Sequence, residues 1–119
     1  MITYQHLLSS IDSTAPTGAC FIALADGQVV GTLGLRLRAP GAYVNSLYVA
    51  PNFQGQGIGR ELLRQAAELS VKMGKTTLGL AVHELNLPAR HLYKSLGFRP
   101  HEFGQQDGYL RYVAFLPLA

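Results

Sequence analysis

The stretch Val44–Arg60, VNSLYVAPNFQGQGIGR, carries the strongest fold signal in the chain. A segment with strand character leads into the pattern Gln-x-x-Gly-x-Gly, formed by Gln54, Gly57 and Gly59, and a helical pattern begins directly after it. The first turn of a helix has backbone N–H groups without intrahelical partners and lies at the positive end of the helix dipole. A phosphate bound there accepts hydrogen bonds from these N–H groups, and its negative charge interacts favourably with the helix dipole. Glycines let the phosphate approach the backbone closely. The stretch therefore predicts a strand, a phosphate-binding loop and a helix.

The alternatives are two other phosphate-binding motifs and a plain connection without a ligand. A dinucleotide fingerprint, G-x-G-x-x-G, requires a glycine where Arg60 or Leu62 stands. A P-loop that ends in Gly74-Lys75-Thr76 requires a glycine where Leu69 stands. Both motifs are therefore incomplete. A plain strand–turn–helix connection, with glycine used only for the turn, stays open.

The rest of the sequence predicts one α/β domain over residues 1–119, with a mixed (α+β) sheet and no regular βαβ repeat. Helical spacing predicts a helix from Ile58 to a stop at Gly74, and a second helix from a cap at Asn86 to a stop at Gly97. Residues 2–11 predict a short additional helix. Strands are predicted over residues 19–25, 28–38, 42–49, 76–82, 98–103 and 109–116.

Composition narrows the possible partners. The net charge is +3, but the ten Lys and Arg residues are scattered, which argues against nucleic-acid binding. Cys20 is the single cysteine, so no intrachain disulfide can form. We find no apolar run of membrane-spanning length and no signal-peptide pattern at residues 1–10, and we expect a cytoplasmic protein. The four histidines have no ligand spacing with a carboxylate, so no metal is predicted.

A second motif lies in the predicted helix after Asn86, which reads Asn86-x-x-Ala89-x-x-Leu92-Tyr93-x-x-x-Gly97-Phe98. It follows the Gln-x-x-Gly-x-Gly loop by about 30 residues. With both motifs in this order, the chain resembles the GCN5-related N-acetyltransferase (GNAT) superfamily over roughly residues 19–115.

The resemblance implies a GNAT fold and direct transfer of an acetyl group from acetyl-CoA to a primary amine. It implies that strand 42–49 splays away from strand 76–82, that the pantetheine arm lies between them, and that an N–H near Val49 faces the developing oxyanion. It implies that Tyr93 protonates the departing thiolate; a packing role for this tyrosine is the alternative. The cofactor-binding residues it implies are Leu47, Tyr48, Val49, Gln54, Gly55, Gln56, Gly57, Ile58, Gly59, Arg60, Asn86 and Tyr93.

The chain departs from the family at the expected general base. Many members carry glutamate or histidine on the strand before the loop, where this chain has Tyr43 and Asn45. We expect both to share a strand face with Leu47 and Val49, but tyrosine, with an ordinary pKa of about 10, is a poor base at neutral pH. The substitutes are His83 and Glu84, acting through water, or these two are solvated loop residues.

The second departure is length. The family usually has a strand and two helices before the first hairpin, whereas residues 1–18 have room for at most one short helix. We therefore expect an acceptor groove that is unusually open or completed by a second subunit, and hence a homodimer. The alternative function is a non-catalytic acyl-CoA-binding or regulatory module.

Overall fold

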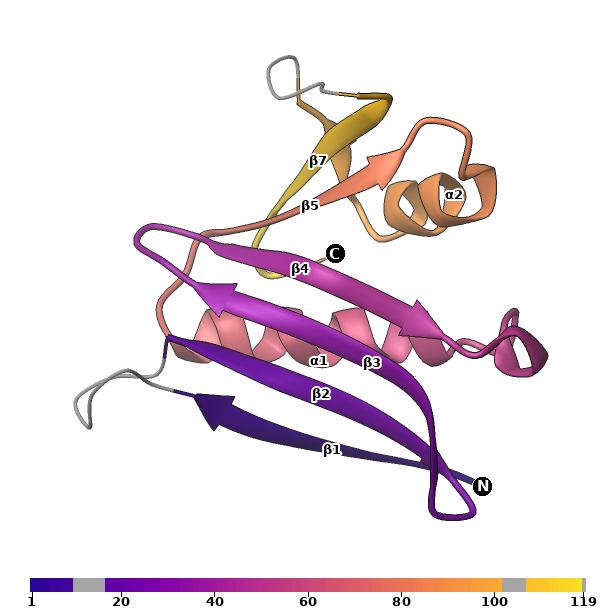
Figure 1. Ribbon diagram of the computed structural model, residues 1–119. Helices are drawn as coiled ribbons and strands as arrows, with labels where there is room; N and C mark the ends of the chain where they lie inside the picture. Colours follow the sequence, from indigo (N-terminus) through magenta and orange to yellow (C-terminus); the bar gives the residue numbers. More distant parts are fainter. Residues whose placement is uncertain (10–16, 102–106, 119) are drawn as a thin grey trace.

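The computed structural model of the protein describes residues 1–9, 17–101 and 107–118 (Figure 1). Its elements, in chain order, are β1 (Ile2–Ser9), β2 (Gly18–Ala25), β3 (Gln28–Leu37), β4 (Ala42–Val49), the 3₁₀ helix η1 (Pro51–Phe53), α1 (Ile58–Lys72), β5 (Thr77–His83), α2 (Leu87–Ser95), β6 (Arg99–Pro100) and β7 (Tyr109–Phe115).

The strands form one seven-stranded sheet in the order β1-β2-β3-β4-β5-β7-β6. The β4–β5 pair is parallel and each of the other pairs is antiparallel. The parallel pair needs a crossover connection, and α1 supplies it. The predicted mixed sheet is therefore confirmed, as are both predicted helices.

The two helices lie on the same face of the sheet. The stripe of α1 that contains Leu62 and Ala66 is fully buried against that face, and Tyr93 of α2 packs against Phe98 and Tyr112. A hydrogen bond of 2.9 Å from the Arg60 guanidinium to Ser95 Oγ links the two helices.

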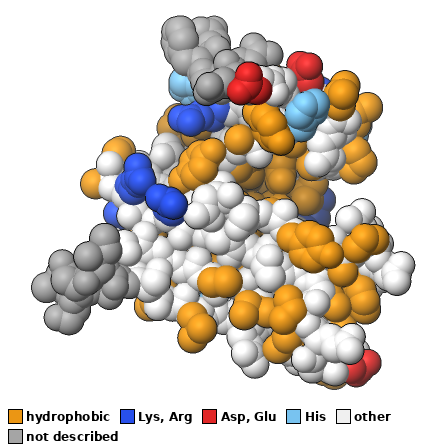
Figure 2. All heavy atoms as spheres, in the orientation of Figure 1, with side chains coloured by type: hydrophobic (Ala, Val, Ile, Leu, Met, Phe, Trp, Pro, Cys, Tyr) orange, Lys and Arg blue, Asp and Glu red, His pale blue; other side chains and the backbone are white. Residues whose placement is uncertain are grey.

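In the described ranges, no helix covers the opposite face, which we call the open face (Figures 1 and 2). Three large apolar side chains on it are exposed: Leu7 at 71%, Val29 at 54% and Tyr48 at 53%.

The helix predicted over residues 2–11 is wrong. Residues Ile2–Ser9 form an edge strand that pairs with β2 along its whole length, from Ile2↔Ala25 to Ser9↔Gly18. On the helix-covered face, the His6 ring stacks on Phe21 with 5.3 Å between the centroids. A short apolar pattern in isolation does not distinguish a helix from a strand, and here the tertiary pairing decides. The N-terminal region therefore keeps a strand, whereas residues 10–16 lie outside the described residues.

The predicted face of Tyr43 and Asn45 is also wrong. Gly34 pairs with Ser46 and Leu35 pairs with Val44, so Asn45 is an extra residue in β4, a β-bulge. A slip of one residue exchanges the two faces of a strand. Leu47 and Val49 therefore lie on the helix-covered face with Val44, while Tyr43, which pairs with Arg36, lies on the open face.

The strand predicted over 98–103 is shorter than expected. β6 comprises Arg99–Pro100, and the last two residues of the predicted range, 102–103, lie outside the described residues. Of the helices that the structure describes, none combines the length and apolar character needed to cross a bilayer.

Candidate active site

The site begins where β4 and β5 separate. The two strands pair only from Ala42↔Leu78 to Val44↔Leu80, although β4 continues to Val49 and β5 continues to His83. The predicted splay is therefore confirmed. Beyond Val44, the edge of β4 that faces β5 has no ladder partner among the described residues, so its backbone N–H and C=O groups can pair with a ligand.

Two cavities meet at this separation. The helix-side cavity, of about 540 Å³, is lined by the end of β4, the glycine-rich loop, the first turn of α1 and one face of α2. The cleft cavity, of about 330 Å³, lies between the splayed ends of β4 and β5. Leu47, Asn86 and Tyr93 line both cavities, so the two cavities adjoin each other at these residues.

The loop presents free backbone donors to the helix-side cavity. Gly55 and Gly57 have φ of 79° and 85°, in the left-handed region that favours glycine. Gly57 is the N-cap of α1 and has no side-chain capping bond. The bond from the Glu61 N–H to the Gly57 carbonyl is 3.0 Å long, and it leaves the N–H groups of residues 58–60 without intrahelical acceptors. Their position at the positive end of the helix dipole suits a phosphate.

Gly59 keeps the space above these donors open. A Cβ built at Gly59 would lie 3.6 Å from Leu92 Cδ2 and 3.7 Å from Val49 Cγ2, both of which line the same cavity. These are ordinary contact distances, so a side chain at this position would occupy the cavity without displacing the walls.

Other residues of the predicted phosphate site are placed differently. Gln54 lines the cavity, and its side-chain amide donates to the Val49 carbonyl at 3.1 Å, which ties the loop to the end of β4. Gln56 donates to the Asn52 carbonyl at 3.5 Å and does not line the cavity. Tyr48 lies on the open face, away from the loop cavity.

Tyr93 stands at the junction of the two cavities. The residue is 6% exposed, and burial raises the pKa of its phenol above the ordinary value. Among the described residues, its hydroxyl has no hydrogen-bond partner, yet none of their side-chain oxygens is both enclosed and unpartnered. The Tyr93 hydroxyl therefore reaches the cavity, and it is protonated at neutral pH.

Asn86 is fixed at the junction by its role in the fold. Its Oδ1 accepts the Ala89 N–H at 3.3 Å and caps α2, and the residue lines both cavities. The predicted cap is therefore confirmed, and a contact between Asn86 and a cofactor, which the family resemblance implies, stays a prediction.

The structure brings His83 to the cleft but not Glu84. His83 lines the cleft cavity, and its ring packs edge-on against Tyr109 with 5.1 Å between the centroids. The Leu85 N–H donates to His83 Nδ1 at 3.2 Å. In the neutral ring, the hydrogen is therefore on Nε2. Glu84 is exposed and lines neither cavity.

The sequence interpretation missed Tyr109 as a cleft residue. Tyr109 begins β7 and pairs with His83, the last residue of β5. The two strands were predicted separately, but only their register reveals this contact. In the part of the chain that the structure describes, no three His, Cys, Asp or Glu residues gather as a possible metal site.

Comparison with known proteins agrees with this geometry. The chain matches the Acetyltransferase (GNAT) family over residues 2–98. It is 33% identical over 97 residues to a putative [ribosomal protein bS18]-alanine N-acetyltransferase of Bacillus subtilis, covering 82% of this chain and 61% of that protein. The chain thus spans less than two thirds of this relative, and it covers 32% and 43% of the length of two other curated relatives.

The fold is similar to solved structures of the same family. The ribosomal-protein-S18-alanine N-acetyltransferase from Escherichia coli superimposes with a TM-score of 0.80 at 23% identity, covering 100% of this chain and 96% of that chain. The PaiA N-acetyltransferase from Thermoplasma acidophilum, in complex with coenzyme A, superimposes with a TM-score of 0.75 at 25% identity, covering 81% and 59%. With the family match over most of its length and the splayed sheet, this chain belongs to the GNAT acetyltransferase family.

Proposed function

We propose that the protein is an N-acetyltransferase that transfers an acetyl group from acetyl-CoA directly to a primary amine. One observation carries the proposal: adjoining cavities extend from the free N–H groups of α1 to a cleft, and at their junction the Tyr93 hydroxyl has no hydrogen-bond partner among the described residues. The loop fits a pyrophosphate, and the unpaired edge of β4 fits the amide groups of a pantetheine arm.

The residues present fit acetyl-CoA along these adjoining cavities. The N–H groups of residues 58–60 would hold the pyrophosphate, with the Gly59 position leaving room for its oxygens. The edge of β4 from Asn45 to Val49 would pair with the pantetheine arm. Coenzyme A supplies an activated acyl group and a thiolate leaving group. The free N–H groups of β4 would stabilise the negative charge that develops on the carbonyl oxygen.

Tyr93 is the general acid in this proposal. Its raised pKa keeps the phenol protonated at neutral pH, and its hydroxyl reaches the cavity junction where the thiolate leaves. A packing tyrosine would need no unpartnered hydroxyl at a cavity wall, so this feature favours the catalytic role.

We propose a hydrogen-bond donor role for His83. Because Nδ1 accepts the Leu85 N–H, the neutral ring carries its hydrogen on Nε2 and has no free lone pair for an ammonium proton. The prediction of a base at His83 or Glu84 stays a prediction. We propose that the amine loses its proton to solvent and that His83 orients the amine or a water molecule. A His83→Gln variant, which keeps a donor, should retain the wild-type pH profile.

The test combines binding and turnover. Acetyl-CoA is titrated into the protein by calorimetry, and thiol release is then followed with a panel of primary amines, for wild type and Tyr93→Phe. Binding with turnover that falls in Tyr93→Phe supports the proposal. Binding without turnover on any amine would favour the alternative of a non-catalytic acyl-CoA-binding module, and absence of binding would contradict both.

The homodimer is part of the same proposal. Association would cover the exposed apolar side chains of the open face and the outer edge of β1, which has no strand partner among the described residues. Light scattering at several protein concentrations measures the mass in solution, and a monomer at all concentrations would contradict this part alone.

A further inference from the structure

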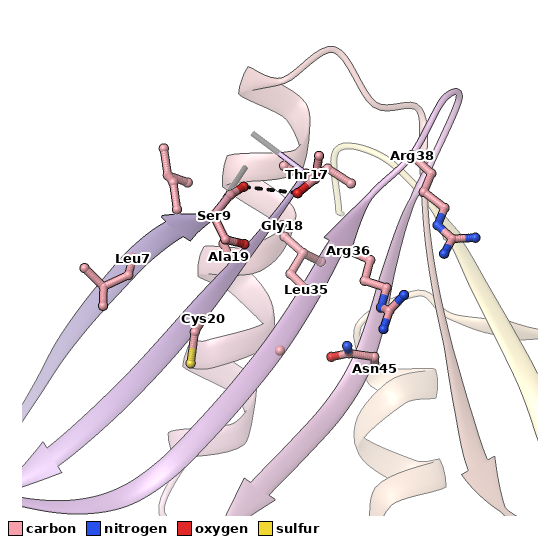
Figure 3. A pocket seen from close by; sticks show the side chains of 13 residues that line it. Leu7, Ser9, Thr17, Gly18, Ala19, Cys20, Leu35, Arg36, Arg38 and Asn45 are labelled. Carbon is pink, nitrogen blue, oxygen red and sulfur yellow. Dashed lines mark hydrogen bonds between the residues drawn. The ribbon is translucent and has the colours of Figure 1, made fainter. Parts of the chain in front are cut away.

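A third cavity opens on the face of the sheet opposite the helices. It has a volume of about 720 Å³, the size range of sites for small organic ligands. Leu7 and Cys20 line one end, and Arg36 and Arg38 line the other (Figure 3). We call it the open-face cavity.

The open-face cavity adjoins the cleft in which acetyl transfer is proposed. Asn45, the extra residue of the β4 bulge, lines both. Arg36 pairs across the sheet with Tyr43, which itself lines the cleft cavity. An acceptor that reaches the cleft from the open face would therefore pass Arg36, while acetyl-CoA would reach the cleft from the helix-covered face.

Arginine side chains lie along this approach. Arg36 and Arg38 extend to the same side of the sheet in Figure 3. In the described residues, neither guanidinium has an ion-pair or hydrogen-bond partner. A third arginine, Arg111, lies with its guanidinium carbon 5.6 Å from the centre of the Tyr43 ring. Among the described residues that line the open-face and cleft cavities, there is no Asp or Glu.

We propose that the acceptor is an amine that carries a carboxylate, and that Arg36, with Arg38, binds this carboxylate. This inference rests on the proposed acetyltransferase function and adds the class of acceptor. The guanidinium presents paired N–H donors that match the two oxygens of a carboxylate. The amine then points to the cleft, and the apolar end at Leu7 and Cys20 receives the rest of the molecule. Unpaired arginines on the approach repel polyamines and other polycations.

The test uses pairs of amines that differ only in the carboxylate. Leucine with leucinamide, β-alanine with β-alaninamide, and 4-aminobutyrate with 4-aminobutanamide place the carboxylate at increasing distance from the amine. Spermidine serves as the polycation. Transfer is followed by thiol release, and binding to the CoA-loaded protein is measured by calorimetry. The proteins are wild type, Arg36→Gln, Arg36→Lys and the control Lys72→Gln, which removes one positive charge from exposed Lys72 in the last turn of α1.

We expect a higher kcat/KM for the carboxylate member of at least one pair. Arg36→Gln should raise the KM for that member by about tenfold or more, because a hydrogen-bonded charge is lost, and should leave its amide and the acetyl-CoA Kd within about twofold. Arg36→Lys should recover part of the loss because it keeps the charge. Added salt should weaken the carboxylate member selectively.

The proposal is overturned if the amides or spermidine are preferred, if Arg36→Gln affects both members of a pair equally, or if no carboxylate member binds the CoA-loaded protein. Failure of wild type to bind acetyl-CoA is a separate result, and it would overturn the acetyltransferase function itself.

Discussion

Substitution of Gly59 by alanine separates cofactor binding from folding. The new Cβ would meet Leu92 Cδ2 at 3.6 Å and Val49 Cγ2 at 3.7 Å, so the protein has room for it. Alanine is favoured over glycine within a helix by about 0.5–1 kcal/mol, and the free energy of unfolding should be unchanged or slightly raised. The methyl group would, however, occupy the cavity above the free N–H groups of α1. Loss of one charge-assisted hydrogen bond there costs about 1.5–3 kcal/mol, which raises the CoA Kd by about 10- to 150-fold.

The assay is calorimetric titration of CoA, with urea denaturation of the same samples. Val71→Ala is the matched control, since Val71 is on the same helix, is 41% exposed and lines none of the three cavities described above. It should leave the CoA Kd unchanged. A Kd for Gly59→Ala within about twofold of wild type, at unchanged stability, would refute a phosphate site at this turn.

Four further predictions follow from the same structure. Gly57→Ala places alanine at φ 85° and should lower the free energy of unfolding by about 1–2 kcal/mol in urea denaturation. Gly31→Ala would place a Cβ 3.0 Å from Ile58 Cγ2, and overpacking should cost about 1–3 kcal/mol in the same assay. Asn86→Ala removes the α2 cap and should cost about 1 kcal/mol, again by denaturation, whereas an unchanged stability would argue against the cap. Tyr93→Phe should lower kcat by about 10²-fold or more. Because burial raises the Tyr93 pKa, the wild-type rate should fall only above the ordinary tyrosine range of about pH 10, and this descending limb should be absent in Tyr93→Phe.

The glycine-rich loop and both helices were readable from the sequence because their signals are local. Helical spacing of apolar residues and the cap at Asn86 act within a few residues, and the structure has α1 and α2 where they were predicted. The glycines after each helix, Gly74 and Gly97, have φ of 76° and 94°, as a helix stop of this kind requires. The family resemblance rests on these same local motifs, and the family match extends it to residue 2.

The tertiary structure alone decided the features that depend on pairing between distant strands. Residues 2–9 form a strand because β2 offers a full ladder, and this overrides a weak helical pattern. The bulge at Asn45 exchanges the faces of β4, so Leu47 and Val49 join the helix-covered side and Tyr43 meets Arg36. The separation of β4 from β5 after Val44 opens the cleft. Arg36, Tyr43 and Arg111 come together from three strands. Strand register depends on long-range contacts, so the spacing of these residues in the sequence does not predict that they meet.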